Sequence, residues 1–71
     1  MSETRIIHIT TEYITLGQFL KFAGIVDEGW EAKPFLEKHE ILVDGEKENR
    51  RGKKLRPGTK VEIEGSGYLI S

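Results

Sequence analysis

The sequence predicts an α+β domain in which two short helices pack on a small antiparallel sheet. Two segments, residues 15–24 and 30–38, carry apolar side chains at helical spacing. One β-branched run precedes them and several strand-like runs follow them. The chain has 71 residues. This length suits one domain with a small core, which we expect to span residues 1–71.

The first half of the chain should form one strand and one helix. Arg5–Thr10 is rich in β-branched residues and predicts a strand. Thr15 and Gln18 have the spacing of a capping box, so we expect the first helix to begin at Thr15. Gly24 suits the left-handed position that ends many helices. The buried face of this helix should consist of Leu16, Phe19, Leu20 and Ala23.

The second helix is predicted at Trp30–Lys38, with Ala32, Phe35 and Leu36 on its buried face. Pro34 is tolerated only in the first turn of a helix, so the regular part should start near Trp30 or Glu31, after an irregular turn. His39 should end the helix in a left-handed conformation. Trp30 is either a base-stacking residue or a partly buried packing residue. We expect packing, because that is the commoner role in a small domain.

The second half of the chain should form the rest of the sheet. Asp44-Gly45 follows the apolar run Ile41–Val43 and predicts a type I′ hairpin turn. The remaining predicted elements are a turn at Arg56–Thr59, a strand at Lys60–Glu64, a turn at Gly65–Gly67 and a last strand at Tyr68–Ile70.

The charges are strongly segregated although the net charge is −1. Lys47–Lys60 holds seven basic residues and one acidic residue, and the rest of the chain holds four basic and eleven acidic residues. A local positive potential of this kind attracts polyanions whatever the net charge. A charge run can also be a merely solvated face, and Lys47 can be paired with nearby carboxylates. We favour a basic hairpin that binds nucleic acid through Lys47, Arg50, Arg51, Lys53, Lys54 and Arg56, with Lys33 and Lys38 of the second helix as further candidates.

Other kinds of site have little support in the sequence. There is no cysteine for a disulfide or a thiolate metal site, and His8 and His39 do not have the spacing of metal ligands. No nucleophile or paired-carboxylate constellation stands out, so we expect neither an enzyme nor a cofactor. No apolar run is long enough to cross a bilayer. We expect a cytoplasmic protein with no membrane partner.

Taken in order, these residues resemble the S4 domain, an RNA-binding module with the alpha-L motif. The matching features are the apolar run Leu16–Leu20, Ala32-Lys33 on the second helix, Ile41–Gly45, the basic stretch Arg50–Lys54, and Pro57-Gly58 followed by Val61 and Ile63. The resemblance implies a central module at about residues 15–64. The likeness is to the small stand-alone bacterial type called YaaA-like or YbcJ-like. Members often carry Ser and Arg at the start of the second helix, where this chain has acidic residues.

The resemblance implies a non-catalytic protein that binds structured RNA, with ribosomal RNA as the first expectation and tRNA as the second. It also implies ribosomal or other ribonucleoprotein proteins as neighbours. A different class of function is a protein-interaction adapter on a ribonucleoprotein complex. Such an adapter would use the acidic surface of Asp27, Glu28, Glu31, Glu37 and Glu40.

Overall fold

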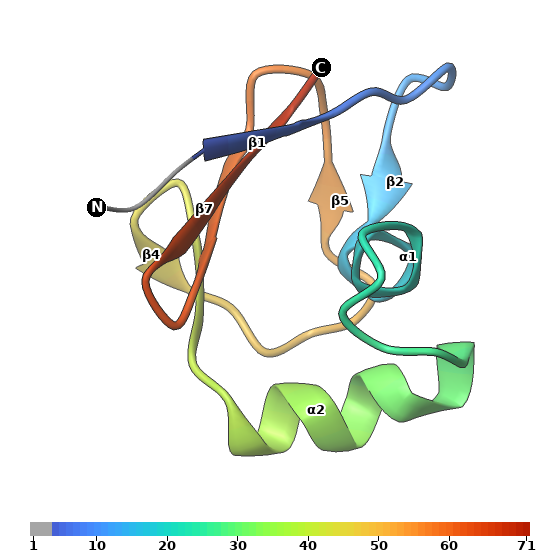
Figure 1. The fold of residues 1–71 in the computed structure, drawn as a ribbon, viewed down its shortest axis with the longest axis vertical. Coiled ribbons are helices and arrows are strands. Elements are labelled where there is room, and N and C mark those ends of the chain that lie inside the picture. The colour runs from blue at the N-terminus through green and yellow to red at the C-terminus, as the bar shows by residue number, and fades with distance from the viewer. Residues whose placement is uncertain (1–3) are drawn as a thin grey trace.

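The computed structural model describes residues 4–71. The elements in chain order are β1 (Thr4–Ile7), β2 (Ile14–Thr15), α1 (Leu16–Phe22), the 3₁₀ helix η1 (Gly29–Glu31), α2 (Ala32–Lys38), β3 (Ile41–Val43), β4 (Glu46–Lys47), β5 (Lys54–Leu55), β6 (Lys60–Ile63) and β7 (Ser66–Ile70). Figure 1 shows α1 end-on beside β2 and β5, with α2 running across below the strands. The predicted α+β class is confirmed.

The strands form two sheets, and one pairing differs from the prediction. The larger sheet has the order β1-β7-β6-β3-β4, and β2 pairs with β5 in a separate two-stranded ribbon. The pairs β7-β6, β6-β3 and β3-β4 are antiparallel, whereas β1 and β7 run parallel, so the larger sheet is mixed. Parallel strands need a long connection, and here nearly the whole chain lies between the two. Nothing in the local pattern of β1 encodes that direction.

The core lies between the helices and the larger sheet. Its fully buried members come from both layers and include Leu16, Phe19 and Leu20 of α1 with Ile41, Val61 and Ile70 of the sheet. Val43 and Ile63 are also buried, and Phe35 is half-buried against the cluster. The alternating burial of β6 places Val61 and Ile63 inward, as its sequence pattern predicts.

The ends of the two helices test the capping predictions. Thr15 caps α1 and forms the predicted box: Thr15 Oγ1 accepts from the Gln18 amide, and Gln18 Oε1 accepts from the Thr15 amide. Gly24 follows the helix with φ of 75°. Pro34 lies in the first turn of α2, after the irregular turn η1. The prediction for His39 is wrong, because its backbone is extended (φ −121°, ψ 139°). The chain enters β3 two residues later and has no room for a left-handed reversal.

The turns of the sheet are of the type that the sequence predicts, with one shift. Asp44 (φ 51°) and Gly45 (φ 84°) both have positive φ, as a type I′ turn requires. The β6–β7 turn uses Glu64 (φ 47°) and Gly65 (φ 85°), one residue earlier than predicted, and Ser66 already belongs to β7. Glu64 adopts this uncommon conformation with its carboxylate bonded to His39 Nδ1.

The prediction that Trp30 packs is wrong, since its side chain is 72% exposed. The buried residues of the second helical segment are instead Ala32 and Leu36 of α2. Phe22, in the last turn of α1, is also exposed, at 64%.

Candidate nucleic-acid interface

The basic run does not lie on a hairpin arm. Strand β4 ends at Lys47, and the chain then leaves the larger sheet and crosses to β5, which pairs with β2. We call residues 48–53 the basic loop. The Glu48 amide makes the last bond back to β3, to the Ile41 carbonyl at 2.9 Å, and the hairpin arm ends there. The predicted basic hairpin is therefore a basic loop that is held between two sheets.

The start of α1 holds the basic loop in place. The Leu16 amide donates to the Lys53 carbonyl at 2.8 Å, and the Gly17 amide donates to the Arg51 carbonyl at 2.9 Å. The first amides of a helix have no partner within the helix, so these two bonds satisfy groups that otherwise need solvent or a cap. The loop is thus fixed through its backbone, with Arg51 exposed and Lys53 half-buried.

Gly17 allows this close approach. A Cβ at Gly17 would lie 3.4 Å from both the Cβ and the carbonyl oxygen of Arg51, and 3.7 Å from the Cβ of Ala32. Gly17 is therefore the point at which α1, the basic loop and the first turn of α2 meet. In the sequence, the one feature that indicates this contact is a glycine in the first turn of a predicted helix.

An ion pair within the loop orders its first half. Arg50 Nε and Nη2 donate to the two oxygens of Glu48 at 3.0 and 3.2 Å, and the Arg50 and Asn49 amides donate to Oε2. The Arg50 hydrogen bond is the main cause that lowers the pKa of Glu48 to about 2, and the same bond raises the pKa of Arg50. The Glu48 side chain is 11% exposed, whereas that of Arg50 is 74% exposed. The guanidinium keeps most of its surface open to solvent.

The β2–β5 ribbon adds an aromatic ring to the basic surface. Ile14 faces Leu55 and Thr15 faces Lys54 across the ribbon. Lys54 Nζ lies 4.9 Å and Arg56 Cζ 5.5 Å from the centre of the Tyr13 ring. Sequence reasoning missed Tyr13, because β2 has two residues and its partner lies about forty positions away.

The structure brings together only part of the predicted site. Arg50, Lys53 and Lys54 line one shallow hollow, and Lys54 and Arg56 flank Tyr13. Lys33 is exposed and directly follows Ala32, which is near Gly17 and the loop.

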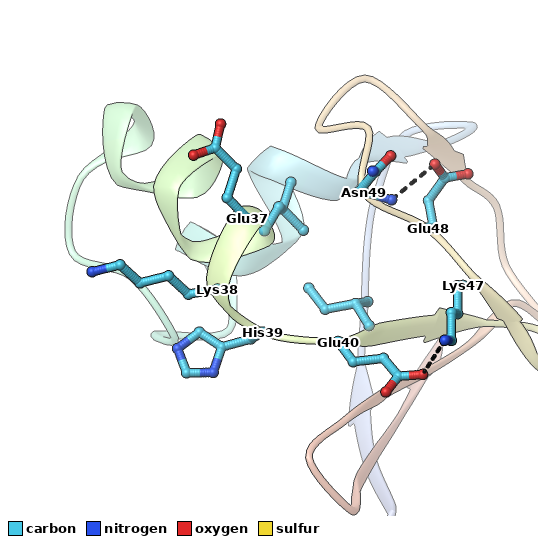
Figure 2. Close-up of a pocket in the computed structure, with 9 residues that line it drawn as sticks. Glu37, Lys38, His39, Glu40, Lys47, Glu48 and Asn49 are labelled. Carbon is cyan, nitrogen blue, oxygen red and sulfur yellow. Dashed lines mark hydrogen bonds and ion pairs between the residues drawn. The ribbon is translucent and has the colours of Figure 1, made fainter.

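Lys38 and Lys47 belong to a second hollow of mixed charge, between α2 and β4. Figure 2 shows Lys47 paired with Glu40, at 3.6 Å, and the Asn49 amide bonded to Glu48. Glu37, Glu40 and Glu48 also line this hollow. The carboxylates reduce the local positive potential, so Lys38 and Lys47 are weaker candidates for phosphate contacts than the residues of the loop.

Two further searches concern residues 4–71 alone. Within that range no helix has the length and apolar character needed to span a membrane. Within the same range no three His, Cys, Asp or Glu side chains gather closely enough to hold a metal ion.

Comparison with known proteins adds two findings. A family model described as "S4 domain" matches residues 7–71. The chain is also similar to a protein of Bacillus subtilis (strain 168) named "Probable ribosome maturation protein RlbA". The two are 59% identical over 61 residues, which cover 86% of this chain and 86% of the relative.

Proposed function

Since the chain belongs to the S4 domain family, we propose that it is a non-catalytic protein that binds structured RNA through the basic loop and the adjoining β2–β5 ribbon. Ribosomal RNA is the first proposed ligand and tRNA the second. The observation that carries the proposal is the docking of the loop on α1, because the Leu16 and Gly17 amides hold its backbone while the side chains of Arg50 and Arg51 stay exposed. We assign the whole chain, residues 1–71, to one RNA-binding domain.

The loop has the chemistry that phosphate recognition needs. Arg50 and Arg51 can donate two parallel hydrogen bonds to one phosphate, which lysine cannot do. A loop that is already fixed loses less conformational entropy when it binds than a flexible one. The proposed contacts are Arg50, Arg51, Lys53, Lys54 and Arg56, then the exposed Lys33 of α2, with Lys38 and Lys47 contributing less.

The name of the Bacillus subtilis relative, a probable ribosome maturation protein, supports ribosomal RNA as the first ligand. It also supports ribosomal or other ribonucleoprotein proteins as neighbours, and the cytoplasm as the place of action. The A-form helices and loops of such RNA present phosphates and unpaired bases that a small basic surface can recognise by shape.

The proposal is tested by titrating the protein into fluorescently labelled RNA. Fragments of ribosomal RNA, tRNA and a DNA duplex of similar length are compared at one salt concentration. We expect the ribosomal fragments to bind most tightly and the DNA duplex least tightly. Equal affinity for all three nucleic acids would contradict a preference for structured RNA.

A second candidate function is the adapter on a ribonucleoprotein complex, which one observation favours. Trp30 is 72% exposed, in a turn flanked by Asp27, Glu28 and Glu31, and this acidic face could dock a basic protein segment. An adapter predicts that Glu37→Lys with Glu40→Lys abolishes association with ribosomal subunits, while loss of the loop arginines is tolerated. RNA binding predicts the reverse.

A further inference from the structure

The Tyr13 ring lies at the surface, directly before strand β2. Its neighbours in the ribbon, Ile14 and Leu55, contact the core, but Tyr13 is outside the core cluster and 36% exposed. Two cations lie against the ring, Lys54 at 4.9 Å and Arg56 at 5.5 Å. An exposed aromatic ring with flanking cations has the components with which proteins bind single-stranded nucleic acid: a stacking surface for the base and positive charge for the phosphates.

We propose that Tyr13, Lys54 and Arg56 form a binding site for one unpaired nucleotide, whose base stacks on the exposed part of the Tyr13 ring and whose phosphates contact the two cations. This inference rests on the proposed RNA-binding function. It narrows the ligand from structured RNA in general to RNA that presents an unpaired base next to a helix.

Charged groups near the Tyr13 ring favour different parts of a bound nucleotide. Lys54 and Arg56 lie over the ring and attract a phosphate. Tyr13 also lines a shallow hollow with Thr11, Glu12 and Gln18, among others. The Gln18 amide oxygen is already used by the α1 cap. The Glu12 carboxylate repels a phosphate but accepts a hydrogen bond from an N–H group of a base.

A simpler role for Tyr13 is to hold the two cations through their contact with its ring. The two roles differ in what they predict. A residue that only positions cations affects every RNA alike, because all RNA has phosphates. A stacking residue affects only RNA with an unpaired base.

The test uses two fluorescent probes: a fully paired RNA hairpin, and the same hairpin with a single bulged adenine. Both are titrated at one salt concentration with the full chain. We expect the wild type to prefer the bulged hairpin, and Tyr13→Leu to lose about 5- to 150-fold in affinity for that probe alone. Tyr13→Phe should retain the preference. Phe22→Leu, which removes another exposed ring, is the matched control and should change neither affinity.

Two results would overturn the site. One is equal affinity of the wild type for the paired and the bulged hairpin. The other is an equal loss for both probes in Tyr13→Leu, because that is the signature of a residue that only positions the cations. A wild type that binds neither probe would refute RNA binding itself, and the inference with it. Melting curves of Tyr13→Leu and Tyr13→Phe show whether each variant is folded at the temperature of the titration.

Discussion

Replacing Gly17 by valine should detach the basic loop from α1. A Cβ alone would sit 3.4 Å from the Arg51 carbonyl oxygen, at the near limit of ordinary contact. Alanine also favours a helix by up to about 1 kcal/mol over glycine, so Gly17→Ala should change the free energy of unfolding by less than about 1 kcal/mol. Valine adds two methyl groups with one preferred rotamer in a helix, which must push into Arg51 or Ala32.

Overpacking of this kind costs about 1–3 kcal/mol. In a domain of this size the melting temperature should fall by roughly 5–20 °C. The direct readout is hydrogen exchange at the Leu16 amide, which bonds to the Lys53 carbonyl. Gly17→Val should accelerate this exchange and weaken RNA binding. Gly29→Val is the control, since a Cβ at Gly29 meets no atom within 4 Å and Gly29 lies outside the basic loop. Unchanged exchange at Leu16 in Gly17→Val would refute the docking of the loop.

Three further predictions address the core, the hairpin turn and the loop. Leu20→Ala removes a fully buried side chain and should lower the free energy of unfolding by about 2–5 kcal/mol, measured by denaturant unfolding. A side chain at position 45 would meet open space, but Gly45→Val forces a β-branched residue to φ of 84°. This variant should lower the free energy of unfolding by about 1–2 kcal/mol and weaken RNA binding as well. The third concerns Glu48, whose folded pKa of about 2 lies below its ordinary value of 4.5. A depressed carboxyl pKa contributes stability that is present above the unfolded value and is lost as the pH falls through the folded value. The Arg50 amide resonance should therefore hold its position from neutral pH to about pH 4 and shift on acidification toward about pH 2, and Glu48→Gln should abolish that shift. A shift centred near the ordinary carboxyl pKa would contradict the Glu48–Arg50 contact.

The features that the sequence predicts correctly are local ones. The Thr15 and Gln18 side chains are three residues apart and cap α1 by bonds within one turn. The Asp44-Gly45 turn likewise depends on two adjacent residues that tolerate positive φ. Contacts of this range are encoded in a few neighbouring residues, so a single sequence is enough to find them.

The features that could not be predicted from the sequence depend on pairings between distant segments. The β2–β5 ribbon joins two dipeptides, and both the exposed Tyr13 ring and the role of Gly17 follow from it. The parallel direction of β1 is likewise set only by β7 at the far end of the chain. The charge count locates the basic loop, but it cannot show that Glu48 is bound to Arg50. Which cations share a surface is decided by the fold.

The central claim is that the cations of the docked loop bind phosphates, and the salt dependence of RNA binding tests it most directly. Arg50 is best left in place because it holds Glu48, whereas among residues 4–71 no ion pair involves Arg51 or Lys53. The variant is therefore Arg51→Ala with Lys53→Ala. The control, Lys21→Ala with Lys60→Ala, removes the same charge from other elements.

The measurement is the slope of log affinity against log salt concentration for a ribosomal RNA fragment. Neutralising about three to five phosphates gives the wild type a slope of roughly −2 to −4. We predict a slope that is shallower by about one to two units in the loop variant and unchanged in the control. A flat response of the wild type, or equal slopes for the loop variant and the wild type, would contradict binding of RNA by the basic loop.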